Sequence, residues 1–449
     1  MAKKQTYPAT PPRERAFLVG VEILGEEGLL PLNDSLDELA LLAETAGLEV
    51  VGEITQKLKH PNAKTFIGSG KVNELKALAE DTLAQVVIFD DELSPRHQRE
   101  LEKLLGENLR LLDRTSLILD IFAQHAKTRE GMLQVELAQY EYYLPRLTRA
   151  WTHLARQGGG GGGRAGGVGG VGLRGPGETQ LEVDRRVIRK RISRIKEDLE
   201  KVRAHRSRHR DKRKKSQMPI VALVGYTNAG KSTLLNQLAE SDVYVADQLF
   251  ATLDPTTRRV DLPGGYKSLF TDTVGFIQKL PTTLVAAFRA TLEEIADADL
   301  LLHVVDISHP NALNHFESVE ETLAEIDANH IPIITALNKI DLLEDQEKAN
   351  TTLENYPRAI AVSAKEKIGI KELRELLKKG LYETYTAITV RLPYQEGNLL
   401  SIFHESGKIE RIEHERGSTL IQGRLPGRLV AKFDGWEVLL EDELANEEI

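Results

Sequence analysis

The sequence predicts a multidomain α/β protein built around a P-loop domain. A glycine-rich loop follows the apolar run Ile220–Val224 and precedes a helical pattern, which is the strand–loop–helix order that phosphate-binding loops require. Short apolar and helical segments also alternate along the first 127 residues, as they do in small parallel sheets. A chain of 449 residues accommodates about three domains with separate cores.

The composition excludes several functional classes. The chain has no cysteine, so it has no disulfide framework, thiol nucleophile or cysteine-bound metal. The first eight residues contain no apolar signal sequence, and the apolar runs of the central domain are far shorter than the roughly 20 residues that span a bilayer. We therefore expect a soluble cytoplasmic protein, a monomer without a membrane span. Its net charge of −9 conceals a strongly basic middle region.

Residues 1–127 are predicted to form a small parallel α/β subdomain with right-handed crossovers. The predicted strands are residues 16–24, 48–54, 85–89 and 109–112, and the predicted helices are residues 36–46, 71–81, 95–105 and 116–126. The glycine spacing of Lys64–Lys71 fits no Walker pattern, so we interpret this segment as a turn before a helix.

Residues 128–216 are predicted to form an antiparallel helical hairpin of the coiled-coil type. The first arm, residues 132–149, carries apolar side chains at helical spacing, and Pro145 should kink or end it. The second arm has an a/d seam formed by Leu181, Ile188, Ile192, Ile195, Leu199 and Val202. An ordinary amphipathic helix on a globular domain is the alternative interpretation.

The tip of this hairpin and its second arm are candidates for RNA binding. Residues 158–172 are mostly glycine, which disfavours regular structure and lets the backbone approach a ligand closely. Clustered cations indicate phosphate contacts, and those we assign to RNA are Arg156, Arg174, Arg185, Arg186, Arg189 and Lys190. A plain flexible linker and a solvated helix face are the competing interpretations.

The P-loop is predicted to surround nucleotide phosphates with backbone N–H groups. Lys231 would contact the β- and γ-phosphates, and the Ser232 hydroxyl would ligate Mg²⁺. The residues assigned to this loop are Gly225, Tyr226, Thr227, Asn228, Ala229, Gly230, Lys231, Ser232 and Thr233. A glycine-rich turn can fit the same pattern by chance, so the assignment depends on the motifs that follow.

Three further motifs, each after a strand-like segment, identify the nucleotide as GTP. In Asp272-Thr273-Val274-Gly275 the carboxylate would hold Mg²⁺ through a water, and the Gly275 N–H would sense the γ-phosphate. In Asn338-Lys339-Ile340-Asp341 the Asp341 carboxylate can accept from the guanine N1–H and exocyclic amine, which adenine cannot satisfy. Ser363-Ala364-Lys365 would direct the Ala364 N–H toward the guanine O6. The order of these motifs predicts a P-loop GTPase domain over residues 217–384.

The position after Gly275 bears on mechanism. Phe276 stands where Ras-type enzymes place the glutamine that orients the attacking water, so Gln278, Thr252, a monovalent cation or a partner must supply that function. Asn228 matches an asparagine that ligates potassium in some cation-activated GTPases, or it is a turn residue that tolerates an unusual backbone. The predicted catalytic residues are Lys231, Thr252 and Gly275, and the predicted Mg²⁺ ligands are Ser232, Thr252 and Asp272. Phe250 and Ala251 are assigned to the nucleotide site beside Thr252. Thr256 and Thr257 are alternatives to Thr252 as the Mg²⁺-ligating threonine.

Residues 385–449 are predicted to form a small α+β domain with an acidic tail. The predicted strands are residues 388–392, 409–414, 418–423 and 428–433, with one helix over residues 398–404. This pattern fits a ferredoxin-like arrangement. The last nine residues are rich in acidic side chains, and we expect them to be disordered.

Two signatures beyond the P-loop resemble the HflX family of GTPases. They are the run Trp151-Thr152-His153-Leu154 and the run from Leu173 to Glu182, and the segments 250–257 and 272–277 are similar to that family as well. The glycine stretch from Gly160 to Gly170 is longer than the usual signature. The resemblance covers nearly the whole chain.

The resemblance implies an N-terminal α/β subdomain, a helical hairpin, a GTPase domain and a small C-terminal domain. It further implies binding to the large ribosomal subunit and its rRNA, with the hairpin tip near the peptidyl-transferase centre, and splitting of stalled or hibernating ribosomes. A GTP-gated RNA-binding adaptor, which Phe276 favours, and an ATP-dependent RNA-remodelling activity in the N-terminal domain are the alternatives.

Overall fold

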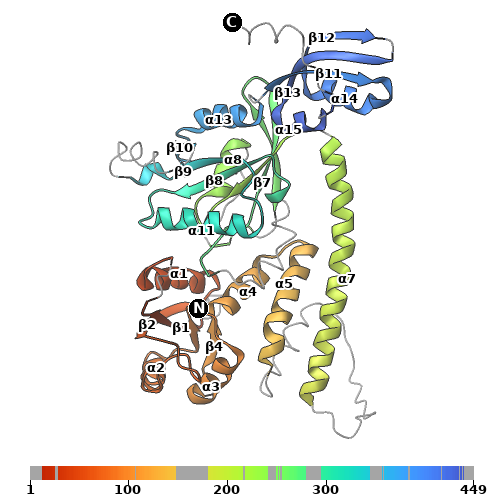
Figure 1. Cartoon of the computed structure of the whole chain (residues 1–449). Helices are drawn as coiled ribbons and strands as arrows, with labels where there is room; N and C mark the ends of the chain where they lie inside the picture. The colour runs from red at the N-terminus through yellow and green to blue at the C-terminus, as the bar shows by residue number, and fades with distance from the viewer. Residues whose placement is uncertain are drawn as a thin grey trace, which may run out of the picture. The chain divides into compact units, whose positions relative to one another are not determined.

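A computed structural model describes most of the chain, and its elements are labelled in Figure 1. The described residues are 13–25, 29–106, 108–147, 180–215, 218–240, 249–250, 252, 255–279, 295–343, 356, 358–382, 385–415, 417–433, 435–436 and 438. The chain divides into two compact units. The first comprises residues 1–205, 246–254 and 274–291, and the second comprises residues 206–245, 255–273 and 292–449.

The first unit contains the small parallel sheet that the sequence predicts, and its four strands have the order β2-β1-β3-β4. Its strands are β1 (Arg15–Ile23), β2 (Glu49–Leu58), β3 (Val86–Phe89) and β4 (Arg110–Asp113), and its helices are α1 (Leu32–Thr45), α2 (Ser69–Asp81), α3 (Pro95–Leu105) and α4 (Arg114–His125). All four side chains of β3 are buried, as expected for a strand covered on both faces.

The helices α3 and α4 of this unit begin at well-formed caps. The Ser94 hydroxyl accepts from the His97 N–H at the start of α3, where Pro95 occupies the first turn. At the start of α4, Asp113 and Ser116 form a reciprocal capping box. These caps fix where the chain leaves the carboxyl ends of the strands.

Two further described helices are α5 (Arg129–Tyr143) and α7 (Gln180–Lys215), of which residues 180–205 of α7 belong to the first unit. They lie side by side over part of their length (Figure 1). Leu137, Ile195 and Leu199 are buried between them, which confirms the central part of the predicted seam. Ion pairs from Arg191 and Lys196 of α7 reach Glu136 and Glu141 of α5. A short 3₁₀ segment, η1 (Leu144–Arg146), follows α5 and contains Pro145, where the sequence predicts its end. The glycine-rich segment lies outside the described residues.

The second unit contains a six-stranded sheet in the order β10-β9-β8-β5-β7-β6, in which only β6 is antiparallel to its neighbour. The strands are β5 (Ile220–Val224), β6 (Thr256–Leu262), β7 (Tyr266–Asp272), β8 (Leu300–Asp306), β9 (Ile333–Asn338) and β10 (Ala359–Ala361). The helices α8 (Lys231–Leu238), α11 (Ala312–Glu325) and α13 (Ile370–Tyr382) belong to the same domain, as does the 3₁₀ segment η2 (Ile340–Leu342). The nucleotide motifs therefore meet at the carboxyl ends of parallel strands.

The C-terminal part of the second unit is a small α+β fold, but one predicted strand is wrong. The antiparallel sheet has the order β11-β13-β12, formed by β11 (Tyr385–Pro393), β12 (Lys408–Glu415) and β13 (Ser418–Pro426), with η3 (Tyr394–Glu396) and α14 (Gly397–Ser406) between its first two strands. Residues 428–433 are helical, in α15 (Gly427–Val430) and η4 (Ala431–Phe433). Leu429 and Phe433, four residues apart, are both buried, and this spacing places two side chains on one face in a helix as well as in a strand. Within the described residues this sheet has three strands and is not ferredoxin-like; the acidic tail lies outside them.

Candidate functional site

The phosphate loop connects β5 to α8 and depends on two glycines. Gly225 and Gly230 both have positive φ, and Gly230 lies in the left-handed region at +92°. A Cβ at Gly225 would collide with the backbone carbonyl of Val304, and one at Gly230 would collide with the Asn338 amide. No larger residue fits either position, so the loop geometry requires glycine at both.

Lys231 already points into this loop. Its Nζ donates to the carbonyl oxygens of Gly225 at 3.0 Å and Tyr226 at 2.7 Å. Burial lowers the pKa of Lys231 to about 8, and the nearby carboxylate of Asp272 opposes that shift. Nucleotide phosphates bound in the loop would add negative charge beside this buried lysine and favour its protonated form.

Ser232 and Asp272 come together as the sequence predicts for Mg²⁺ ligands. The Ser232 hydroxyl donates to Asp272 Oδ2 at 2.6 Å, which brings a hydroxyl and a carboxylate oxygen side by side next to the phosphate loop. The adjacent Thr273 hydroxyl donates to the Leu223 carbonyl at 2.6 Å and fastens this end of β7 to β5. Hard oxygen donors of this kind suit Mg²⁺, so the residues present fit the ion.

The base-recognition motifs are joined to the phosphate loop through Asn338. Its Nδ2 donates to the Ala229 carbonyl at 2.9 Å, and its Oδ1 accepts from the Ala364 N–H at 3.0 Å. The Ala364 N–H, which we predicted to face guanine O6, is therefore engaged by Asn338 in this structure. The Ser363 hydroxyl donates to Asp341 Oδ1 at 2.6 Å and leaves the other carboxylate oxygen in place for a base.

Two further motif residues adopt the left-handed backbone conformation. Lys339 has φ +66°, and its Nζ forms an ion pair with Asp306 at 2.7 Å. Asn228 is exposed with φ +59°, which asparagine tolerates better than most residues. The turn interpretation thus accounts for Asn228 without a cation. Lys365 is exposed, next to the buried Ala364.

Two segments are predicted to contact the γ-phosphate, and both belong to the first unit. Thr252 is described without regular structure, Ala251 lies outside the described residues, and the Phe250 ring is buried against Phe122 of α4 at 4.6 Å between ring centres. Gln278, a candidate for orienting water, donates to the Ser35 hydroxyl at 2.9 Å.

The rivals of Thr252 have other surroundings. Thr256 and Thr257 begin β6, and the Thr257 hydroxyl is 3.0 Å from that of Thr271 on β7. Because Thr256 and Thr257 lie in a strand, Thr252 is the candidate Mg²⁺-ligating threonine that lies in a loop. Phe276 is buried, in keeping with its apolar side chain.

Sequence reasoning missed the residues that pack behind the phosphate loop. The Tyr226 ring stacks on His315 of α11, with 3.9 Å between ring centres and 5° between planes. His303 of β8 is fully buried, and burial followed by the charge of Lys231 lowers its pKa to about 3, so it stays neutral. A histidine in an otherwise apolar strand was the available signal for this second residue.

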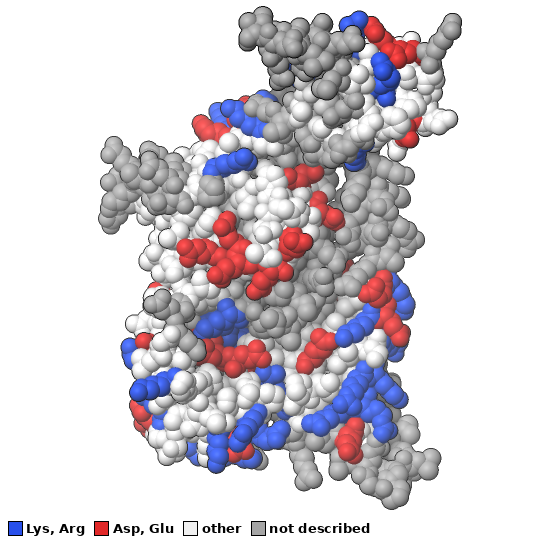
Figure 2. All heavy atoms as spheres, viewed as in Figure 1, with Lys and Arg blue, Asp and Glu red and all other residues white. Residues whose placement is uncertain are grey.

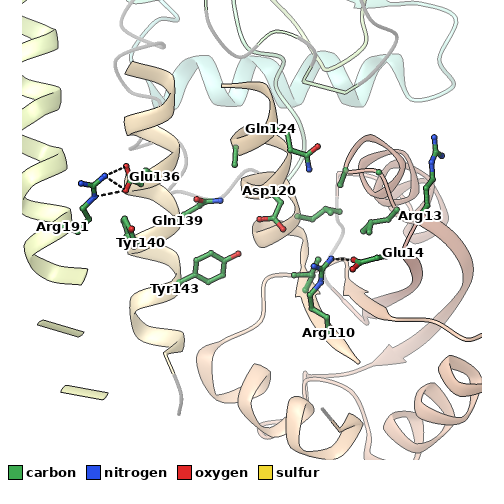
Figure 3. A pocket seen from close by; sticks show the side chains of 16 residues that line it. Arg13, Glu14, Arg110, Asp120, Gln124, Glu136, Gln139, Tyr140, Tyr143 and Arg191 are labelled. Atoms are coloured by element: carbon green, nitrogen blue, oxygen red, sulfur yellow. Dashed lines mark hydrogen bonds and ion pairs between the residues drawn. The ribbon is translucent and has the colours of Figure 1, made fainter. Parts of the chain in front are cut away.

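A cavity of 760 Å³ lies in the first unit, and no residue of the nucleotide motifs lines it (Figure 3). Two ion pairs lie in its lining, Arg110 with Glu14 and Arg191 with Glu136. Asp120 of α4 faces the cavity, and burial raises its pKa to about 6 despite the opposing charge of Arg110. The sequence contains no pattern that indicates this cavity.

The candidate RNA-binding residues are only partly described. Arg186, Arg189 and Lys190 are exposed on α7 and Arg185 is half-buried, whereas Arg156 and Arg174 lie outside the described residues. Figure 2 shows Lys and Arg side chains gathered over the lower part of α7 as Figure 1 draws it. Among the described helices, none is long and apolar enough to cross a membrane.

Comparison with known proteins covers nearly the whole chain. Residues 33–123 match a family described as GTP-binding GTPase N-terminal, residues 125–213 match the GTP-binding GTPase middle region, and residues 220–339 match a family described as 50S ribosome-binding GTPase. A protein of Caldanaerobacter subterraneus named GTPase HflX is 48% identical over 88% of this chain and 87% of its own. A protein of the same name from Escherichia coli is 46% identical over 92% of this chain and 94% of its own length. A solved structure of a Sulfolobus solfataricus GTP-binding protein with GDP is 25% identical, with a TM-score of 0.43, over 82% of this chain and 98% of that one.

Proposed function

The chain belongs to the HflX family of GTPases, and we propose that it binds the large ribosomal subunit and uses its nucleotide state to split stalled or hibernating ribosomes. The observation that carries this proposal is a guanine-nucleotide site preceded in the same chain by a basic helical arm. The match of residues 220–339 to a family described as 50S ribosome-binding GTPase supports the partner.

In this proposal the site residues have distinct roles in hydrolysis. Lys231 would neutralise charge on the β- and γ-phosphates, Ser232, Asp272 and Thr252 would hold Mg²⁺, and the Gly275 N–H would contact the γ-phosphate. Asp341 selects guanine. Catalysis here consists of positioning and charge stabilisation, because phosphoryl transfer needs little covalent chemistry from the protein.

None of these residues orients the water that attacks the γ-phosphate. Phe276 is buried and carries no polar group, and the Gln278 amide donates to Ser35. We propose that the ribosome completes the site, or that K⁺ at Asn228 adds positive charge to it. Hydrolysis would then release the segments around Thr252 and Gly275, which the γ-phosphate and Mg²⁺ order.

The test is GTP hydrolysis by the pure protein with and without large ribosomal subunits, in potassium and in sodium. Slow turnover that rises steeply with subunits supports the proposal, and no response to subunits contradicts it. A requirement for potassium would assign the cation role to Asn228. Lys231→Ala should abolish nucleotide binding, and normal turnover by that variant would refute the site assignment.

The basic arm is tested by replacing Arg185, Arg186, Arg189 and Lys190 with glutamine. This change should weaken subunit binding and reduce its salt dependence while unstimulated hydrolysis stays unchanged. A matched control replaces four exposed cations elsewhere in the first unit, Lys59, Lys64, Arg96 and Arg99, and so removes the same charge. Equal losses in both variants would show a general charge effect rather than a contact made by α7.

A further inference from the structure

The cavity of the first unit is lined by residues of β4, α4, α5 and α7 and of the loop before β2 (Figure 3). Its volume of 760 Å³ is in the range of cavities that hold small organic ligands. All of its lining residues belong to the first unit, so the cavity is a property of that unit alone. A site formed by these residues needs neither the nucleotide motifs nor the second unit.

The charges in the lining leave one carboxylate without a cation. Two ion pairs are each neutral, and they join Arg110 to Glu14 at 2.8 Å and Arg191 to Glu136 at 2.8 Å. Arg13 is exposed, where water screens its charge. Asp120 is the remaining charged side chain of the lining, and within the described residues it forms no ion pair.

Asp120 makes an ionised side chain at this place unfavourable for folding. It is half-buried on α4, and burial raises its pKa to about 6 despite the opposing charge of Arg110. At neutral pH the ionised carboxylate therefore lowers the free energy of unfolding. A cation held against Asp120 would offset this loss, because an opposite charge favours the ionised form. Carboxylates with a raised pKa that face a cavity are frequent at binding sites.

The neighbours of Asp120 suit an ammonium group on an apolar body. Gln139 and Tyr143 of α5 line the cavity together with Asp120 (Figure 3). Burial, followed by the charges of Asp120 and Asp113, raises the pKa of Tyr143, so its hydroxyl stays protonated at neutral pH. Amide and phenol oxygens can accept from an ammonium group, and a tyrosine ring attracts a cation to its face. The apolar part of the wall consists of the buried side chains Leu48, Leu112 and Leu117.

We propose that this cavity binds a small organic amine, whose ammonium group pairs with Asp120 while its apolar body packs against the leucines of the wall. One positive charge is what the lining accommodates, since the two ion pairs are neutral and Asp120 carries a single negative charge. An anion would have to approach Asp120 with only the exposed Arg13 to attract it. This binding requires neither GTP nor the ribosome, so it is an addition to the proposed function.

The experiment measures binding of 2-phenylethylamine to the full chain by calorimetry at pH 8, with 2-phenylethanol and phenylacetate as matched probes. The three compounds share an apolar body and differ in charge. The amine should bind roughly tenfold more tightly than the alcohol, which is the effect of one hydrogen bond to a charged group, and phenylacetate should bind more weakly than either. Tighter binding of phenylacetate than of the amine, or no binding of the amine, would overturn the proposal.

The variant Asp120→Asn should bind the amine roughly tenfold more weakly and the alcohol as tightly as the wild type does. Lower stability does not explain such a loss, because removal of the buried charge should stabilise the first unit at pH 8. Asp37→Asn, an exposed position on α1 outside the lining, is the control and should leave both affinities unchanged. Equal amine affinities of the wild type and Asp120→Asn would contradict the assignment of the ammonium group to Asp120.

A second readout is the pH dependence of amine binding. Protonation of Asp120 removes the charge that the ammonium group contacts, so the wild-type affinity should fall roughly threefold from pH 8 to pH 5.5. Asp120→Asn should abolish this difference, and a pH dependence retained in the variant would refute the role of Asp120. Nα-acetyl-lysine amide, which carries the same ammonium group on a polar body, should bind more weakly than 2-phenylethylamine. The reverse order would make a protein lysine the occupant and overturn the proposal of a small amine.

Discussion

Replacement of Asp120 by asparagine should stabilise the first unit at neutral pH and have no such effect in acid. Asp120 is half-buried on α4, and burial raises its pKa from 3.8 to about 6. A raised carboxyl pKa means that the folded state binds the proton more tightly than the unfolded state does. The loss of folding free energy caused by ionised Asp120 is thus nearly absent below pH 4. It grows between pH 4 and pH 6 and is constant at higher pH.

The magnitude follows from the two pKa values. The interval from 3.8 to about 6 corresponds to about 3 kcal/mol, which is an upper bound because the side chain keeps some contact with solvent. Asparagine has nearly the same shape without the charge, so Asp120→Asn should recover most of this free energy at pH 8 and only a small part of it at pH 4.

The assay is native-state hydrogen exchange of peptides from α4 and α5, with wild type and variant compared at the same pH. This measurement reports opening of the first unit and needs no two-state unfolding of the whole chain. Asp34→Asn, an acidic position on α1 outside the cavity lining, is the control. A stabilisation of equal size at pH 4 and pH 8, or a loss of stability at pH 8, would refute the reasoning.

Three other substitutions test the site and the hairpin. Gly230→Ala should abolish binding of a fluorescent GTP analogue, because the new Cβ would meet Asn338 and the φ of +92° is unfavourable for alanine; retained affinity would contradict the loop geometry. Asp341→Asn should weaken GTP binding about 100-fold in calorimetry, since a charged acceptor for guanine is lost, and an unchanged affinity would remove Asp341 from base recognition. Leu199→Ala should destabilise the packing of α7 on α5 by about 2 kcal/mol, measured as faster hydrogen exchange in both helices, and protection equal to the wild type would show that the seam does not hold them.

The parts of the structure that follow from contiguous residues were predictable. The phosphate loop, the capped start of α3 and the alternation of strands and helices in the first unit depend on neighbours in sequence. The apolar run of β8 was an available signal that we did not use, because it carries no nucleotide motif. In the edge strand β6, apolar and polar residues alternate only weakly, and the strand contains two arginines. Its sequence therefore barely indicates a strand.

The failures share a physical cause, since they depend on contacts between distant residues. Residues 428–433 contain apolar side chains that suit a strand as well as a short helix, and only the packing of Phe433 decides between them. The partner of Gln278 is 243 residues away, and Asp90, with which Lys279 forms an ion pair, is 189 residues from that lysine. No local pattern specifies such pairs, so the anchoring of this segment could be learned only from the structure.

The nucleotide site thus has two parts of different character. In the second unit, hydrogen bonds join Asn338 to the phosphate loop and Ser232 to Asp272, so the residues predicted to contact the base, the inner phosphates and the metal are linked to one another. Thr252 and Gly275 belong instead to segments that group with the first unit. In the proposed function, GDP shares with GTP the contacts to the base and the inner phosphates, whereas GTP adds contacts of its γ-phosphate with Lys231, Gly275 and the Mg²⁺ site. We therefore expect substitutions of Thr252 and Gly275 to alter GTP binding more than GDP binding.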